Sequence, residues 1–102
     1  MSKPAQKIVR TGQWLYDEAV WRPVHVVRMN YDFWYEIAKV DDQLEPGEQP
    51  DLNADGVCYY LLYSNPGPKP WWPNESGGHS VAEAMRRAEA ALPSTVVWTE
   101  EP

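Results

Sequence analysis

The fold class depends on residues 80–93, which read SVAEAMRRAEAALP. Ser80 followed three residues later by Glu83 is a capping box, in which the two side chains accept hydrogen bonds from free N–H groups of the first turn. An apolar stripe then recurs at the helical period, formed by Val81, Met85, Ala88 and Leu92. Pro93 ends the helix because proline has no N–H to continue it. We therefore expect one helix over about residues 81–92, packed closely against a sheet through its alanines.

Most of the remaining chain has the composition of strands. Residues 7–16 and 57–63 are rich in β-forming side chains, and residues 95–99 form a last short strand. Residues 20–39 alternate with a period of two over a length well above that of a usual strand. We expect a break at residues 30–32, where Asn and Asp favour a turn, so that the run makes two strands. One long, bent strand is the alternative.

Two polar connections separate these elements. Residues 41–56 hold six acids and no base, and residues 64–78 are punctuated by proline and glycine, which predicts an irregular or polyproline-like course. The expected order is β-β-β-β-α-β, an α+β fold with a twisted antiparallel sheet of four to five strands and one C-terminal helix packed on it. The alternative is an SH3-like, partly closed barrel with the helix appended. We expect a single domain over residues 1–102, with residues 1–6 disordered.

The charge of the chain excludes some classes of partner. With 9 Lys+Arg against 15 Asp+Glu, its formal net charge is −6. This acidity argues against nucleic-acid binding through a broad basic face and against docking on anionic lipid. No apolar run reaches the ~18 residues of a membrane span, and the first residues lack the apolar segment of a secretory signal. Because Cys58 is the single cysteine, no internal disulfide forms, and a reducing compartment, the cytoplasm, is expected.

The charge is also unevenly distributed. Residues 1–40 hold six bases and four acids, whereas residues 41–102 hold three bases and eleven acids. A mildly basic half and an acidic half could pair between two copies, so a homodimer is one expected assembly. The simpler explanation is that acidic loops keep an aromatic-rich protein soluble.

A weak metal motif lies in the acidic connection. Asp51, Asn53 and Asp55, followed by Gly56, resemble the first half of a calcium loop, in which alternate side-chain oxygens surround a hard cation. The twelfth position of such a loop needs a carboxylate, and here it is Leu62. We therefore expect an acidic loop that ends in a turn. A weak calcium site is the alternative, and no other cofactor is expected.

The nucleophiles and histidines do not form a catalytic pattern. Cys58 lies inside an apolar strand, where a small buried thiol is the ordinary case. His25 is on the apolar parity of its strand, which indicates a hydrogen-bonded histidine in the core or at its rim, and His79 borders a glycine pair and should be solvated. Two histidines and one cysteine supply no zinc ligand set. We predict no catalytic residue.

The aromatic residues are the most suggestive feature. Trp71 and Trp72 stand between prolines in a loop, and a rigid loop that presents two indoles could stack on a partner. The alternative is that both indoles fold back to cap a small core. Trp34 is on the polar parity of its strand, so either the helix or another subunit should cover it. We predict a small, non-enzymatic binding domain that uses an aromatic surface around Trp71 and Trp72 and associates with itself or with another protein.

A rival function is a small-molecule or enzymatic pocket between sheet and helix. Its lining would be Tyr35, Tyr59 and Trp98, with His25 or His79 as the polar group. A calcium-dependent module at residues 51–55 is the weaker alternative. The predicted binding residues are therefore Trp71, Trp72, Trp34, Tyr35, Tyr59, His25 and His79.

Overall fold

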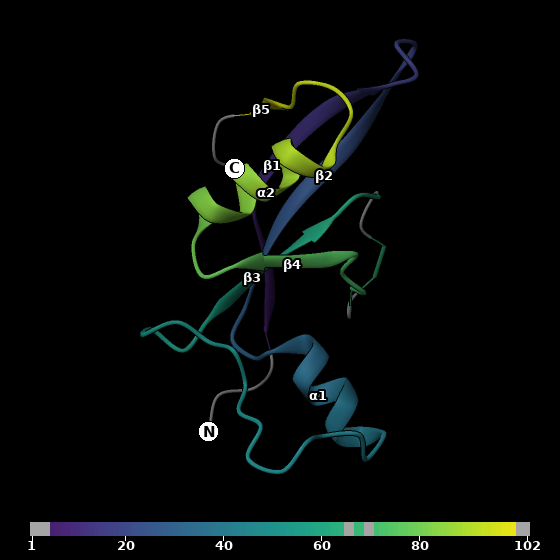
Figure 1. The fold of residues 1–102 in the computed structure, drawn as a ribbon. Helices are drawn as coiled ribbons and strands as arrows, with labels where there is room; N and C mark the ends of the chain where they lie inside the picture. Colours follow the sequence, from purple (N-terminus) through teal and green to yellow (C-terminus); the bar gives the residue numbers. More distant parts are fainter. Residues whose placement is uncertain (1–4, 65–66, 69–70, 100–102) are drawn as a thin grey trace.

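The computed structural model describes residues 5–64, 67–68 and 71–99, which form one antiparallel sheet with two helices (Figure 1). The elements are β1 (Gln6–Tyr16), β2 (Val20–Met29), α1 (Phe33–Val40), β3 (Cys58–Leu62), β4 (Glu75–Gly78), α2 (Val81–Ala91) and β5 (Val97–Trp98). The strand order is β4-β3-β2-β1-β5, and every pair is antiparallel. The expected α+β class with an antiparallel sheet is confirmed. In the described residues the edge strands β4 and β5 do not pair, so the sheet is open and is not an SH3-like barrel.

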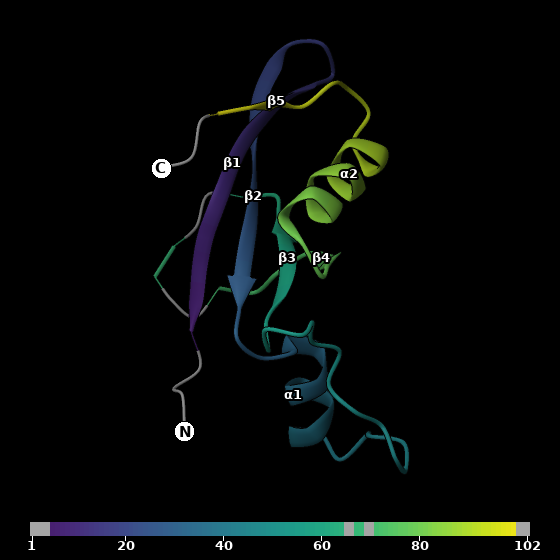
Figure 2. The ribbon, with the colours of Figure 1, turned by 90° about the vertical axis from the view of Figure 1, so that its left-hand side faces the viewer.

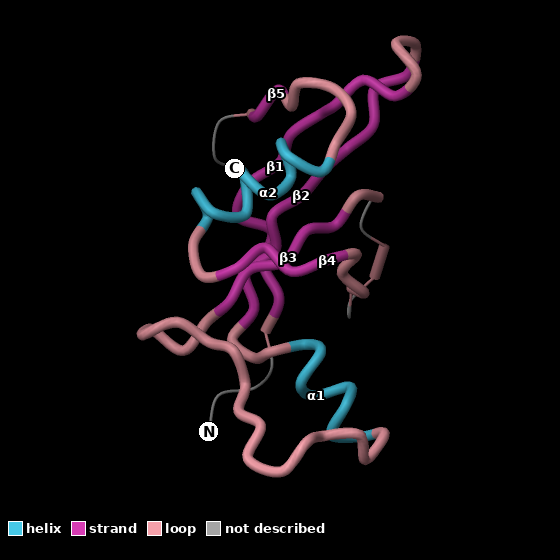
Figure 3. Tube along the Cα trace, in the orientation of Figure 1, coloured by secondary structure: helices cyan, strands magenta, loops and turns pink. Residues whose placement is uncertain are grey.

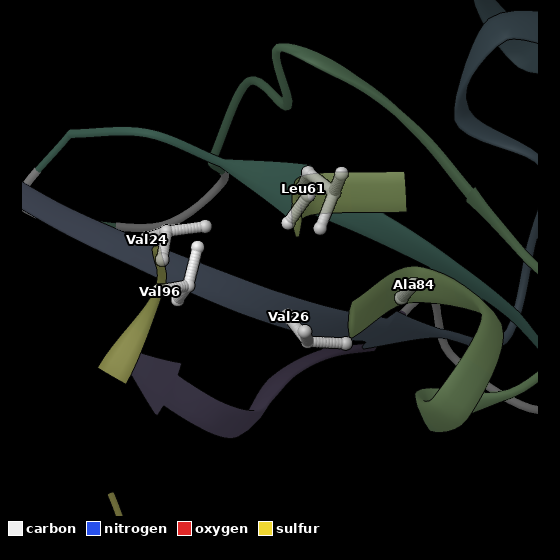
Figure 4. Packing of buried hydrophobic residues seen from close by; sticks show 6 residues of the cluster. Val24, Val26, Leu61, Ala84 and Val96 are labelled. Atoms are coloured by element: carbon white, nitrogen blue, oxygen red, sulfur yellow. The ribbon is translucent and has the colours of Figure 1, made fainter. Parts of the chain in front are cut away.

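Helix α2 covers one face of the sheet (Figure 2). Its N-cap is Ser80, whose side chain accepts a hydrogen bond from the Glu83 N–H at 3.0 Å, as the capping box predicts. Beneath the helix lies a cluster of buried side chains, Val24, Val26, Leu61, Ala84, Ala88 and Val96 (Figure 4). The small side chain of Ala84 lets the backbone of β4 approach, and a Cβ added at Gly77 would lie 2.8 Å from the Ala84 Cβ.

A second cluster lies on the other face, because side chains alternate along each strand. It contains Val27, Met29, Phe33, Cys58, Tyr60 and Leu62. Partly buried Ile37 of α1 and Trp71 of the loop before β4 pack against it. The two clusters show that this thin sheet is covered on both faces by different parts of the chain.

Helix α1 corrects our prediction of a strand over residues 33–39. The break at residues 30–32 occurs, but Asp32 is a helix N-cap, and its side chain accepts a hydrogen bond from the Tyr35 N–H at 3.1 Å. Phe33 and Ile37 are four residues apart, a spacing that fits both one face of a strand and one face of a helix. Since this stretch pairs with no other strand among the described residues and Asp32 caps it, it forms a helix and neither a second strand nor the end of one long, bent strand.

Strand β4 corrects the expected irregular course of residues 64–78. Its residues are mostly small and polar, yet Tyr60 pairs with Ser76 and Tyr59 with Gly78. Pairing with β3 and close packing under α2 order this segment despite its poor strand propensity. At the other end of the chain, Gln6 was expected to be disordered but begins β1 and is buried. Residues 1–4 lie outside the described residues.

Candidate binding surface

Two exposed indoles flank one buried ring. Trp34 on α1 is 44% exposed and Trp72 in the loop before β4 is 66% exposed. Both pack edge-on against Phe33, with ring-centroid distances of 5.1 Å for Trp34 and 5.4 Å for Trp72. Phe33 itself is only 6% exposed and belongs to the core. We call Trp34, Phe33 and Trp72 together the aromatic surface. Helix α1, which carries Phe33 and Trp34, lies at the end of the molecule opposite the β1–β2 hairpin (Figure 3).

The loop that carries Trp72 is tied down on both sides. The Gln6 side-chain amide donates to the Trp71 carbonyl oxygen at 2.8 Å, and its oxygen accepts from the Trp71 N–H at 2.7 Å. On the other side of Trp72, the Asn74 N–H donates to the Leu61 carbonyl oxygen at 2.8 Å. The Asn74 side chain in turn accepts from the Tyr63 N–H at 2.8 Å. The backbone at Trp72 is therefore held between β1 and β3.

Trp71 and Trp72 point to different environments. Trp71 packs against the second core cluster, and its indole N–H donates to the Gly67 carbonyl oxygen at 2.7 Å. Trp72 stays largely exposed. The core-cap expectation therefore describes Trp71, whereas Trp72 is left exposed and its role as a contact residue stays a prediction.

A hydrogen-bond network fixes the start of α1 beneath Trp34. Asp32 Oδ1 accepts from the Tyr60 hydroxyl at 2.9 Å, and the Tyr60 oxygen accepts from the Phe33 N–H at 2.8 Å. Asp32 Oδ2 accepts from the Asp51 N–H at 2.8 Å. Burial raises the pKa of Tyr60, so its hydroxyl keeps the proton that it donates. The network joins α1, β3 and the acidic connection.

A small cavity adjoins this network. Its volume is about 210 Å³, and its lining consists of Asp32, Trp34, Asp51, Cys58, Tyr60, Ser76 and Gly78. Burial raises the pKa of Cys58 to about 11, and the thiol donates to the Tyr31 carbonyl oxygen at 3.1 Å. Cys58 is therefore a protonated thiol at neutral pH, which is a poor nucleophile.

Two side chains of the half calcium loop, Asp51 and Asn53, are engaged with other parts of the protein. Asp51 Oδ1 lies 2.7 Å from His79 Nε2. The Asn53 side-chain oxygen accepts from the N–H groups of Asp55 at 2.9 Å and Val57 at 3.1 Å, while its amide donates to the His79 carbonyl oxygen at 3.0 Å. In the part of the chain that the structure describes, no group of three or more His, Cys, Asp or Glu could hold a metal ion. The calcium site stays a prediction.

The residues of the predicted sheet–helix pocket do not converge on one cavity. Tyr59 and Trp98 pack against the cluster under α2. Tyr35 lies on α1, whose core contacts belong to the other cluster. His25 alternates with Val24 and Val26 and therefore faces away from α2; it is 8% exposed, and its Nδ1 lies 3.0 Å from the Thr11 hydroxyl oxygen.

Two residues that shape the aromatic surface, Phe33 and Gln6, were not predicted from the sequence. Phe33 was expected on a strand beside Trp34, where neighbours point to opposite faces, whereas the helix lets the two rings touch. An Asn-Tyr-Asp turn followed by an amphipathic octet was the signal that could have found α1. Gln6 carried no signal, because its partner is a backbone far along the chain.

No family model matches this chain, and no curated protein or solved structure matches it at a significant level. None of the helices among the described residues is long and apolar enough to cross a membrane. Function is therefore inferred from the geometry of the site itself.

Proposed function

We propose that this chain is a small, non-enzymatic binding domain that engages a protein partner through the aromatic surface of Trp34, Phe33 and Trp72. The observation that carries the proposal is the pair of exposed indoles packed edge-on against one buried ring. Tryptophan dominates the energetics of protein interfaces because it buries a large area with few rotatable bonds. A buried, free Cys58 is compatible with a reducing compartment such as the cytoplasm.

Preorganisation supports this proposal. Binding is weakened when loops and side chains must be ordered at the interface. Here Trp72 stands between two backbone segments that are already hydrogen-bonded to the sheet, and Trp34 stands on a capped helix. Little further ordering is needed when a partner covers the two indoles.

The first candidate partner is a second copy of the chain. Phe33 and Trp34 of the aromatic surface lie on α1 with Glu36, and the Asp51 N–H of the acidic connection donates to Asp32 at the start of that helix. In a two-fold dimer the same surface of each copy meets, so the exposed indoles of one copy would lie against those of the other. Self-association would also supply the cover that Trp34 needs.

Light scattering of the wild type and of Trp72→Ala tests the proposal. We expect a dimer for the wild type and a folded monomer for Trp72→Ala, with Trp34→Ala in the same direction. Trp21→Ala is the matched control, because Trp21 is also exposed but lies on the β1–β2 hairpin. A wild type that is monomeric at all concentrations rules out the second copy. A dimer that persists in Trp34→Ala/Trp72→Ala rules out the aromatic surface as its interface.

The cavity beside Trp34 favours a second candidate function, a small-molecule pocket. It lies at the start of α1 and not between sheet and α2, where the sequence predicted one. Its carboxylates and hydroxyl could orient a small polar ligand, with Trp34 as a wall. Titration of a small-molecule library against Trp fluorescence tests it. A saturable hit that Trp34→Ala abolishes and Trp72→Ala retains would support the pocket, and a hit equally affected by Trp21→Ala would not.

A further inference from the structure

Two cations lie side by side on the face of the sheet that carries α2, opposite to the face against which α1 packs. Lys7 of β1 and Arg28 of β2 are direct partners in the strand register. Arg28 alternates with Val27 and so shares the α2 face with Val24 and Val26. Both basic side chains are exposed.

This pair is unfavourable without a counter-charge. Like charges directly opposite each other on neighbouring strands repel and destabilise the sheet. Neither Lys7 nor Arg28 makes an ion pair or a side-chain hydrogen bond with any residue that the structure describes. In a chain of net charge −6, two neighbouring cations without an acidic partner point to an anion that comes from outside.

The pair borders a small cavity with a fixed rim. The cavity has a volume of about 210 Å³ and is lined by Ala5, Lys7, Arg28, Asn30 and Val57. The Ala5 N–H donates to Asn30 Oδ1 at 2.8 Å, and the Asn30 N–H donates to the Ala5 carbonyl oxygen at 3.4 Å. These two hydrogen bonds hold the ends of β1 and β2 together. Ala5 and Val57 are the apolar residues of the cavity lining.

We infer that this cavity binds a small carboxylate with a short apolar tail. The planar guanidinium of Arg28 matches both oxygens of a carboxylate, and the Lys7 ammonium adds a second positive charge. The tail would lie against Ala5 and Val57. A volume of about 210 Å³ is below that of pockets for drug-sized ligands, so it suits a ligand of a few heavy atoms. None of these residues belongs to the aromatic surface, so the test of this site is independent of the test of the proposed function.

Butyrate and its neutral isostere butyramide are the probes that test the site. We expect saturable NMR shifts of the amides of Ala5, Lys7, Arg28, Asn30 and Val57 on addition of butyrate at constant ionic strength. Butyramide should bind at least about tenfold more weakly, since it lacks the charge that the cations recognise. Arg28→Gln and Lys7→Gln should each weaken butyrate binding by about tenfold or more. The controls Arg22→Gln and Lys39→Gln, which remove the same charges elsewhere, should bind as the wild type does.

Folding of the variants is checked by their melting temperature, which should equal or exceed that of the wild type because the like-charge repulsion is removed. Equal shifts with butyrate and butyramide, or binding retained in both Arg28→Gln and Lys7→Gln, would overturn the site. The absence of any saturable shift would overturn it as well. Inorganic phosphate that binds more tightly than butyrate would overturn the carboxylate assignment, because phosphate has no tail for the apolar wall.

Discussion

Two exposed tryptophans at opposite ends of the molecule are held in different ways. Trp72 packs on buried Phe33, and the residues on both sides of it are hydrogen-bonded to strands. Trp21, 55% exposed, lies near the tip of the β1–β2 hairpin, where residues 20–24 pair with β1 alone among the described strands. The turn of that hairpin places Asp17 and Glu18 at φ values of 50° and 55°, which non-glycine residues adopt at a cost.

Trp21 and Trp72 are both exposed, but they differ in how much freedom each would lose when a partner binds. A two-stranded ribbon beyond the body of a sheet is only marginally stable, so its side chains lose more freedom when a partner orders them. Figure 2 shows the ribbon extending past β5, while α1 sits against the other end of the sheet. Of the two ends, the one with the anchored indoles is therefore the one that we propose as the binding site.

The largest change in the free energy of unfolding is expected when Phe33, the ring against which both indoles pack, is removed. Phe33→Ala deletes a buried aromatic side chain and should lower the free energy of unfolding by about 3–5 kcal/mol. Urea unfolding measures this loss. Tyr16→Ala, at the exposed hairpin end, is the control and should change stability far less. If Phe33→Ala and Tyr16→Ala lowered the free energy of unfolding equally, the end at α1 would not be better anchored than the hairpin end.

Loss of the two hydrogen bonds that hold the Trp72 loop to Gln6 should lower the free energy of unfolding by less. Gln6→Ala removes two hydrogen bonds to the Trp71 backbone and should lower the free energy of unfolding by about 1–3 kcal/mol. Amide hydrogen exchange at Trp71 and Trp72 should become faster at the same time. Gln13→Ala, at an exposed position of the same strand, should stay within about 0.5 kcal/mol of the wild type. Unchanged exchange in Gln6→Ala would show that the loop is not held by this side chain.

Protonation of His25 should weaken the fold slightly at acidic pH. Burial lowers the pKa of His25 from its ordinary value of 6.5, and its Nε2 is buried without a hydrogen bond in the described residues. Between the lowered pKa and 6.5 the unfolded chain binds more protons than the folded protein, so the free energy of unfolding falls as pH decreases through this window. Urea unfolding at a series of pH values measures this slope.

His25→Gln should remove the slope, whereas His79→Gln should leave the contribution of His25 in place. A wild type and a His25→Gln variant with the same pH dependence between 6.5 and the lower pKa would contradict the assignment.

The smallest change in stability is expected on addition of calcium. Because the Asn53 side-chain oxygen already accepts from two backbone N–H groups and Asp51 Oδ1 lies against His79 Nε2, added calcium or chelator should leave the melting temperature unchanged. Magnesium at the same concentration is the control for ionic strength. A rise with calcium that chelator reverses would instead establish the weaker alternative, a calcium-dependent module at Asp51, Asn53 and Asp55.

Helix α2 and the break at residues 30–32 were predictable because their signals are local. The cap, the apolar stripe and the terminating proline of α2 all lie within residues 80–93, so this segment by itself specifies the helix. Helix α1 was missed because Phe33 and Ile37, four residues apart, share one face in a strand and also in a helix. Strand β4 was missed because pairing with β3 orders residues with little strand propensity of their own.

The chemistry of the candidate site was visible in the sequence, but its geometry was not. Composition and order alone determined the α+β class, the capped C-terminal helix, the acidic connection and the surplus of tryptophan. The tertiary structure alone decided that Trp71 turns inward, that Trp72 meets Trp34 across Phe33, and that Lys7 stands beside Arg28. The physical reason is that each of these contacts joins segments distant in sequence. Their partners are chosen by strand register, by packing and by side-chain hydrogen bonds that exist only once the sheet has formed.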